Sequence, residues 1–463
     1  MTPEHYDVVV IGGGPGGQKA AIQAAKAGRR VLLVEREPNI GGACVRLGTI
    51  PTKTLREVAA SLDGFLRRGG PRFEVNRSEA FQPARLLERV GQVVEVHERY
   101  MGDQIQRNGI DRWHGRARFV SAREVEVLGI DRTRRLASGD IVVIATGSSP
   151  RLAPEAPADH EHVFDSDSIL SIAYLPRTLA VLGAGVIATE YASIFATLGV
   201  EVTMIDKGER PLAFLDADIV ERFVDAFGLA GGRFLGRRAV EGVAWDGVSA
   251  VVTRLAGGEE ISTDKVLVAL GRVANLDGLD VEAAGLHPTS RGLLKVDENC
   301  RTEVLHIYAV GDVIGPPALA STSMEQGRRA VRHALGLPAG VPPELVPVGV
   351  YTIPEMSSVG LSEAQAKERH GGAVVGRARF DEIARGQIAA NQDGMLKLVA
   401  DARGEKLLGV QVVGEGASEL VHVGQMALLA GWNVDGFVDT IFNFPTLAEA
   451  YRVAALDLLS RRP

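Results

Sequence analysis

Residues 6–35 read YDVVVIGGGPGGQKAAIQAAKAGRRVLLVE, and this stretch decides the fold of the N-terminal region. An apolar, β-branched run leads into a glycine-rich turn, as a buried parallel strand would. A helical pattern follows over residues 18–27, and a second apolar run ends at the acid Glu35. Strand, G-x-G-x-x-G, helix, strand and acid in this order are typical of a Rossmann dinucleotide-binding unit.

Each feature of that pattern has a physical role in holding a dinucleotide. Gly12 permits the tight turn, Gly14 lets the backbone approach a pyrophosphate, and Gly17 lets helix and strand pack closely. The phosphates meet the positive end of the helix. Glu35 is expected to accept a hydrogen bond from the ribose.

A second unit of the same kind begins at residue 179. Gly183, Gly185 and Ala188 form G-x-G-x-x-A, and the next apolar run ends at Asp206. Two Rossmann units in one chain predict two bound dinucleotides.

The preference of the second unit between NAD and NADP stays open. Asp206 suits the free 2′-hydroxyl of NAD and repels a 2′-phosphate. Lys207 and Arg210 follow directly, and a cationic side chain there could meet that phosphate. Solvated surface charge is the alternative interpretation of both cations. An acid beside two cations is what a site that accepts NAD and NADP would carry.

The chain has 463 residues, of which 46% are hydrophobic and 24% charged, the balance of an ordinary globular protein. A helix is expected over about 79–108, where Phe81, Leu86 and Val90 recur at helical spacing. The last 120 residues alternate strands and amphipathic helices without a nucleotide fingerprint, which indicates an α+β interface domain.

We therefore expect an α/β fold of two Rossmann-like domains and a C-terminal α+β domain. The expected boundaries are 1–150 and 277–345 for the first domain, in two parts, 151–276 for the second and 346–463 for the third.

Residues 40–55, IGGACVRLGTIPTKTL, carry the chemistry that is most specific to this chain. Four residues separate Cys44 from Thr49. A redox disulfide needs two sulfurs, one to attack and one to resolve, and Thr49 cannot supply the second.

Together these motifs resemble the flavoprotein pyridine nucleotide–disulfide oxidoreductase family, which includes glutathione reductase and dihydrolipoyl dehydrogenase. The resemblance spans nearly the whole chain and rests on the two glycine motifs and on further short stretches: GGACVRLGTIPTK at 41–53, ATG at 145–147, GAGVIATE at 183–190, GR at 271–272, AVGD at 309–312 and NFPTLAE at 443–449. It implies FAD in the first Rossmann unit, NAD or NADP in the second, and a homodimer formed by the C-terminal domain.

Two positions depart from the disulfide reductases of this family. Thr49 replaces the second cysteine, and Phe444 stands where those enzymes have a histidine before the proline. Glu449 matches the glutamate that orients that histidine, but phenylalanine cannot transfer protons. Thiol chemistry is therefore expected to be absent.

One branch of the family, whose members exchange hydride between pyridine nucleotides, resembles this chain closely at residues 210–216, RPLAFLD, and at residues 442–456, FNFPTLAEAYRVAAL. The resemblance implies NADPH + NAD⁺ ⇌ NADP⁺ + NADH by a ping-pong mechanism through FAD. It places Lys53 and Glu190 at the flavin as an ion pair, with Thr49 facing the ring. Further cofactor contacts are implied at Gly42, Ala43, Cys44, Thr146, Gly147, Gly271, Asp312 and Ala320.

Other functions stay open at this stage. A quinone or dye reductase would use the same flavin and the same hydride input. A non-catalytic binding subunit and a true disulfide reductase are weaker alternatives. The net charge of −7, without a long basic run, argues against nucleic-acid binding, and the two cysteines fit a cytoplasmic protein. No apolar stretch reaches the ~20 residues that a membrane helix needs, so no membrane partner is expected, and no metal site is expected either. The residues do not decide whether the dimer forms larger assemblies.

Overall fold

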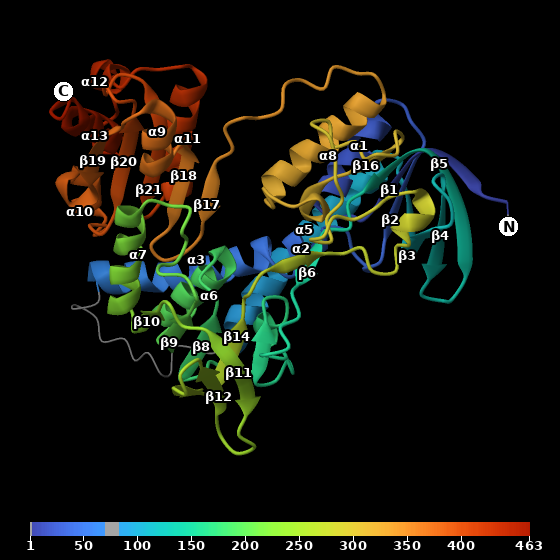
Figure 1. Cartoon of the computed structure of the whole chain (residues 1–463), viewed down its shortest axis with the longest axis horizontal. Coiled ribbons are helices and arrows are strands. Elements are labelled where there is room, and N and C mark those ends of the chain that lie inside the picture. Colours follow the sequence, from blue (N-terminus) through green and yellow to red (C-terminus); the bar gives the residue numbers. More distant parts are fainter. Residues whose placement is uncertain (1, 70–82) are drawn as a thin grey trace. The chain divides into compact units, whose positions relative to one another are not determined.

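The computed structural model describes residues 2–69 and 83–463, and the side chains of 83–86 are not described (Figure 1). The described chain forms two compact units. The first comprises residues 2–54, 87–151 and 271–343, and the second comprises 55–69, 152–270 and 344–463.

The first unit is built on a parallel sheet with the strand order β3-β2-β1-β5-β16. A further strand, β4, pairs antiparallel with both β3 and β5. The bounds are β1 (Glu4–Ile11), β2 (Val31–Glu35), β3 (Asp111–Phe119), β4 (Glu124–Gly129), β5 (Arg134–Ile144) and β16 (Ile307–Ala309). Central strand β1 is buried on both faces from Val8 to Ile11, which explains its unbroken apolar run.

Helices α1 (Pro15–Lys26) and α8 (Ala320–Ala334) pack closely together in this unit, as Figure 1 shows. A Cβ at Gly327 of α8 would lie 2.1 Å from the carbonyl oxygen of Gly16. The two helix backbones are therefore in direct contact at this glycine. A third helix, α5 (Pro83–Arg107), agrees with the helix expected over 79–108. Phe81 lies outside the described residues.

The second unit contains an all-parallel sheet of order β10-β9-β8-β14-β7. Its strands are β7 (Val163–Asp165), β8 (Thr178–Leu182), β9 (Glu201–Ile205), β10 (Gly232–Leu235) and β14 (Lys265–Val268). Helices α6 (Val186–Thr197) and α7 (Ala217–Leu229) belong to this Rossmann-like part, and β11 (Val240–Trp245), β12 (Val251–Leu255) and β13 (Glu260–Thr263) form an antiparallel meander.

An antiparallel sheet of order β17-β18-β21-β20-β19 forms the C-terminal part of the second unit. Its strands are β17 (Val348–Val350), β18 (Met356–Gly360), β19 (Val374–Arg379), β20 (Met395–Ala400) and β21 (Leu407–Val413), and its longer helices are α9 (Glu363–His370), α11 (Ala417–Leu429) and α13 (Glu449–Leu459). Met356 and Met395 share one apolar core with Phe195 and Phe223 of the Rossmann-like part. The predicted fold class, two Rossmann-like domains with a C-terminal α+β domain, is confirmed.

Further elements of the described chain are the 21-residue helix α3 (Thr49–Gly69) and the shorter α2 (Gly42–Arg46), β6 (Ser148–Pro150), β15 (Arg272–Ala274), the 3₁₀ turn η4 (Gly311–Ile314), α10 (Ala384–Ile388) and α12 (Asp435–Asp439). Among the described helices, none is both long and apolar enough to cross a membrane. Over the same residues, no group of three or more His, Cys, Asp or Glu side chains is placed to hold a metal ion.

Candidate active site

The first glycine loop leaves no room for side chains at two of its glycines. Gly12 has φ +103°, and a Cβ there would lie 2.3 Å from the carbonyl oxygen of Ala145. A Cβ at Gly17 would lie 1.9 Å from the oxygen of Gly12. Only glycine therefore allows β1 to turn directly into α1.

Gly14, by contrast, faces a gap between two backbone segments. A Cβ at Gly14 would meet only the Cα of Gly42, at 3.9 Å, while Gly42 itself has φ +59°. The amide of Gly41 donates to the oxygen of Gly13 at 2.9 Å and fixes the second segment against the first. The result is a backbone cradle at the N-terminus of the 12-residue helix α1. Backbone amides at such a helix end bind phosphate.

Glu35 lies at the end of β2, as predicted, with its carboxylate beside the glycine loop. Oε2 accepts from the amide of Gly13 at 2.6 Å, and Oε1 accepts from the amide of Glu37 at 2.9 Å. Each carboxylate oxygen can accept a second hydrogen bond, so Glu35 can still accept one from a ribose hydroxyl.

Thr146, Gly147, Gly271 and Asp312 all belong to one region of the first unit. The hydroxyl of Ser148 donates to Asp312 Oδ2 at 2.6 Å. Arg272, the neighbour of Gly271, donates to the Ser148 hydroxyl at 2.9 Å and to its carbonyl oxygen at 2.7 Å. β6 and β15 pair antiparallel and join these turns.

Cys44 and Thr49 lie on two successive helices, one short and one long. Cys44 is on α2, and Thr49 begins α3 after a break at 47–48. Burial raises the pKa of the Cys44 thiol, while a hydrogen bond with Thr49 and the charge of Lys53 oppose that rise. The threonine hydroxyl therefore contacts the one sulfur, at the position where a second sulfur would be needed.

The second glycine loop repeats the geometry of the first. Gly183 has φ +109°, and a Cβ there would lie 2.6 Å from the oxygen of Ala269, whereas Gly185 has open space. The 12-residue helix α6 starts at this loop. Glu190 on α6 is 4% exposed, and its Oε1 accepts from the amide of Tyr351 at 2.9 Å.

Asp206 directly follows β9, as predicted, and its Oδ1 accepts from the amide of Gly208 at 2.6 Å. Lys207 is exposed. Arg210 turns toward the following loop, where Nη2 donates to the oxygen of Ala213 at 3.2 Å and Nη1 is buried without a hydrogen-bond partner.

Two family models match this chain from near its start to near its end. The pyridine nucleotide-disulphide oxidoreductase model matches residues 6–327, and the dimerisation domain of the same family matches residues 346–455. The chain belongs to the pyridine nucleotide-disulphide oxidoreductase family.

Several named relatives are similar over their full length. A soluble pyridine nucleotide transhydrogenase of Mycobacterium bovis is 44% identical over 98% of this chain and 97% of its own. The protein of that name in Marinomonas sp. is 40% identical over the whole of both chains. Among solved structures, LpdA of Mycobacterium tuberculosis has a TM-score of 0.89 at 27% identity, covering 98% of this chain and 99% of LpdA. The HOCl-induced flavoprotein disulfide reductase RclA of Escherichia coli has a TM-score of 0.87 at 27% identity, covering 98% and 100%.

The first unit of this oxidoreductase fits the FAD on which the family depends. The hydroxyl of Thr146 is buried without a hydrogen-bond partner in the protein. A buried hydroxyl of this kind usually has a partner, which a bound cofactor would supply. The Gly14–Gly42 cradle, the free accepting capacity of Glu35 and the carboxylate of Asp312 complete a set of groups suited to a dinucleotide. Ala43 is exposed, and Ala320 is the first residue of α8.

The predicted catalytic residues are divided between the two units. Lys53 and Thr49 belong to the first unit, and Glu190 belongs to the second. The ion pair between Lys53 and Glu190 therefore stays a prediction. In the second unit, Phe444 is 69% exposed, and Glu449 Oε2 accepts weakly, at 3.4 Å, from the amide of Thr446.

Sequence reasoning missed Ser148 and Asn275, which hold Asp312 and the turn at Thr146 and Gly147 in place. Asn275 donates from its side chain to the oxygen of Thr146 at 3.0 Å and from its amide to the oxygen of Gly147 at 2.9 Å. The two serines that follow Gly147 were the only local sign that side chains support this turn. Their partners are more than 120 residues away in the chain.

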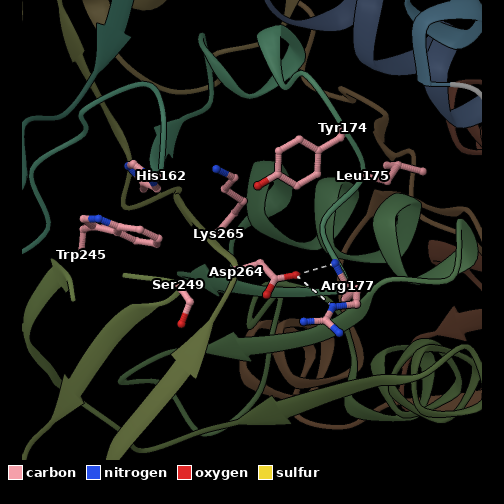
Figure 2. A pocket seen from close by; sticks show the side chains of 8 residues that line it. All are labelled: His162, Tyr174, Leu175, Arg177, Trp245, Ser249, Asp264 and Lys265. Carbon is pink, nitrogen blue, oxygen red and sulfur yellow. Dashed lines mark hydrogen bonds and ion pairs between the residues drawn. The ribbon is translucent and has the colours of Figure 1, made fainter. Parts of the chain in front are cut away.

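A hollow of about 310 Å³ in the second unit lies away from the nucleotide loops (Figure 2). It is formed where β7, β8 and β14 begin, whereas dinucleotides bind where parallel strands end. The ring of His162 stacks on Trp245 with centroids 3.9 Å apart, and Lys265 Nζ donates to the oxygen of Glu161 at 2.7 Å. Asp264 accepts from the amide of Arg177 at 2.7 Å. These polar groups are satisfied within the protein, so we do not include the hollow in the candidate site.

Proposed function

We propose that this protein transfers hydride between NADPH and NAD⁺, with FAD as the carrier: NADPH + NAD⁺ ⇌ NADP⁺ + NADH. When bound, FAD would supply a two-electron group that can accept and return a hydride. The relatives that are named soluble pyridine nucleotide transhydrogenases, at 40% and 44% identity over nearly full length, support this assignment.

The contact between Cys44 and Thr49 carries the proposal. The family's disulfide chemistry needs a second sulfur and an acid–base group. This chain has the hydroxyl of Thr49 in place of the second sulfur and the phenyl ring of Phe444 in place of the acid–base group. Both glycine loops are nevertheless intact, so electrons can enter from a nicotinamide and must leave to a soluble acceptor.

The protein's own groups bind and orient the reactants in this scheme. The Gly12–Gly17 loop, Glu35 and Asp312 hold FAD, and the Gly183–Gly185 loop with Asp206 holds the nicotinamide nucleotide. Lys53 supplies positive charge at the flavin, and Glu190 is its counter-ion. Gly42, Ala43, Thr146, Gly147, Gly271 and Ala320 line the FAD, and Lys207 and Arg210 serve the second nucleotide.

One nicotinamide site used twice in each cycle requires ping-pong kinetics, because the first product must leave before the second substrate binds.

We also propose that the chain divides into four parts, at residues 1–150, 151–276, 277–345 and 346–463. The match to the dimerisation domain supports a homodimer, which forms the unit of any larger assembly. The reaction takes place in the cytoplasm, where both substrates are present.

Stopped-flow spectroscopy under anaerobic conditions tests the function. NADPH is expected to bleach the flavin absorbance, and a second mix with NAD⁺ is expected to restore it rapidly. Bleaching without recovery by NAD⁺, but with recovery by a quinone, would assign the protein as a quinone reductase instead.

A pair of glycine variants tests which loop holds the nicotinamide nucleotide. Gly183→Val is expected to keep the flavin and lose both half-reactions, because a side chain at φ +109° meets the oxygen of Ala269. Gly228→Ala lies in the same unit with open space around it and is expected to keep both half-reactions.

A further inference from the structure

Backbone hydrogen bonds join the turn after β9 to the turn after β10, and the two turns form one surface. The amide of Arg238 donates to the carbonyl oxygen of Asp206 at 2.9 Å, and the amide of Arg237 donates to that of Gly208 at 2.9 Å. These bonds continue the pairing of the two strands past their ends. The turn of the predicted ribose acid, Asp206, is therefore fixed directly beside two arginines that are distant from it in sequence.

This surface lies at the edge where the nucleotide is expected. Dinucleotides bind at the carboxyl ends of parallel strands, and the acid after the second strand of a Rossmann unit meets the adenosine ribose. β9 is that second strand, and β10 is its outer neighbour. A group attached to the 2′-oxygen of that ribose would therefore project between Asp206 and the turn after β10.

The local backbone holds the arginine turn in a costly conformation. Arg237 has φ +57°, the left-handed region that side-chain-bearing residues rarely adopt. A Cβ at the preceding residue, Gly236, would lie 2.8 Å from the oxygen of Glu209 and 2.9 Å from that of Gly208. Strained residues of this kind concentrate at ligand sites, which points to a function for the turn.

Both arginines face carboxylates of the same unit, although all the side chains are well exposed. Arg237 Nη2 donates to Glu209 Oε1, and Arg238 Nε lies 3.7 Å from Glu259 Oε2. The side chains of Arg237 and Glu209 are 70% and 74% exposed. Exposed ion pairs are weak, so an arriving dianion can replace the carboxylate at small cost.

Arg210 can offer a 2′-phosphate only part of its guanidinium group. Its Nη2 is committed to the oxygen of Ala213, within its own loop. The strand pairing instead brings in Arg237 and Arg238, whose amides are bonded to the Asp206–Gly208 turn itself.

We propose that Arg237 and Arg238 recognise the 2′-phosphate of NADP(H), and that Glu209 takes the place of that phosphate at Arg237 when NAD(H) is bound. Asp206 serves the free 2′-hydroxyl of NAD(H). One site thereby binds both nucleotides, because the carboxylate neutralises the arginine whenever the phosphate is absent. The inference rests on the proposed function, which requires both nucleotides to use this loop.

Isothermal titration calorimetry on the FAD-loaded protein separates the two nucleotide classes. The probes are adenosine 2′,5′-bisphosphate, which carries the 2′-phosphate, and 5′-AMP, which lacks it. Arg237→Ala and Arg238→Ala are each expected to weaken binding of the bisphosphate about tenfold through loss of a charge-assisted bond, and to change 5′-AMP binding less than about twofold.

Glu209→Gln is expected to change binding of the bisphosphate in the opposite direction. Removing the competing carboxylate is expected to tighten binding of the bisphosphate about threefold, with 5′-AMP unchanged. A gain cannot result from misfolding, so this variant keeps the test valid if an arginine variant is damaged. Arg254→Ala is the matched control, because Arg254 is also exposed and paired with a glutamate, Glu260 at 3.2 Å, but lies on the meander.

Equal effects on both probes, or no effect of Glu209→Gln, would overturn the proposal. Its failure can be told apart from failure of the proposed function. Hydride transfer from NADPH to NAD⁺ with unchanged bisphosphate binding in the arginine variants would reject only the assignment of Arg237 and Arg238. Bisphosphate binding that depends on Arg237, without transfer to NAD⁺, would reject only the transhydrogenase reaction.

Discussion

The surroundings of Cys44 favour the uncharged thiol. Burial raises its pKa above the ordinary value, and the hydrogen bond with Thr49 and the charge of Lys53 do not reverse that rise. The thiolate is the reactive form of cysteine. At neutral pH, Cys44 is therefore expected to be a packing residue.

Cys44→Ser is expected to change the rate of hydride transfer from NADPH to a NAD⁺ analogue by less than about threefold. The reason is that a protonated thiol contributes neither a nucleophile nor charge. Steady-state turnover of the FAD-loaded variant measures this. A loss of a hundredfold or more would mean that the sulfur takes part in the reaction.

The same pKa direction predicts how alkylation depends on pH. A raised pKa leaves less thiolate at any given pH, so Cys44 should react with iodoacetamide more slowly than free cysteine at pH 7.5. Its rate should still be rising above pH 9. Mass spectrometry of the labelled peptide in wild-type protein gives the rate for Cys44 separately from the buried Cys300.

The sequence predicted the positions of single candidate residues where a local pattern identified them. Glu35 and Asp206 end strands beside glycine loops, and both positions agree with the structure. Ser148 was missed because its function depends on Asp312, 164 residues further along the chain. Side-chain networks between distant segments leave no periodic signal in the sequence.

At the scale of elements, the contact of α1 with α8 depends on one glycine. Gly327→Ala would place a methyl group 2.1 Å from the oxygen of Gly16, inside the glycine loop. Separating the helices is expected to cost about 1–3 kcal/mol in stability and to lower FAD retention. Urea unfolding and the ratio of flavin to protein absorbance measure the two effects.

Gly91→Ala is the matched control on another helix of the same unit. Gly91 lies within α5, is exposed, and has open space around it. Alanine is there expected to be neutral or to stabilise by up to about 1 kcal/mol. Equal effects of the two substitutions would show that the close helix contact is not what matters at Gly327.

Lys397 joins the Rossmann-like part of the second unit to its C-terminal sheet. Its side chain is 2% exposed, and its Nζ lies 2.9 Å from Asp216, 3.0 Å from Asp218 and 2.8 Å from Glu363. Lys397→Met would leave these carboxylates without their shared cation and is expected to cost about 3–5 kcal/mol. Lys367→Met removes only the exposed partner of Glu363 and should cost less than about 1 kcal/mol. Urea unfolding distinguishes the two.

The same cluster predicts a loss of stability in acid. Burial alone would raise the pKa of Glu363, but hydrogen bonds from Lys367 and Lys397 and their charges lower it from 4.5 to about 2. A carboxylate with a lowered pKa in the folded state stabilises the protein fully above its unfolded-state pKa. That contribution is therefore lost as the pH falls from about 4.5 to 2. In Glu363→Gln, this part of the acid dependence should disappear.

Individual strands could be predicted from the sequence, whereas their pairing and order in the sheets could not. Unbroken β-branched runs identified β1, β8 and β9, because strands buried on both faces show no alternation. The antiparallel pairing of β4 with both β3 and β5 was not predictable, because register and strand order depend on contacts across the sheet. The attachment of the Rossmann-like part to the C-terminal sheet through Lys397 depends on a buried lysine, which sequence patterns do not distinguish from a surface one.

At the scale of the whole molecule, the C-terminal part carries exposed apolar side chains that the single chain does not cover. Those with the largest exposure are Ile441 (91%), Phe444 (69%), Ile388 (63%) and Leu429 (61%). All lie within residues 346–455, the match to the family's dimerisation domain. Exposed apolar side chains within a dimerisation domain are the expected contacts with a second subunit.

Ile441→Asp is expected to weaken the homodimer at least a hundredfold. Burying an isoleucine side chain contributes about 1.5–3 kcal/mol, and an aspartate in its place adds the cost of burying a charge. Sedimentation velocity over a range of concentrations measures the monomer–dimer equilibrium. Leu152→Asp is the control, because Leu152 is equally exposed, at 91%, but lies outside the dimerisation match. A dimer that withstands Ile441→Asp but dissociates with Leu152→Asp would place the interface elsewhere on the molecule.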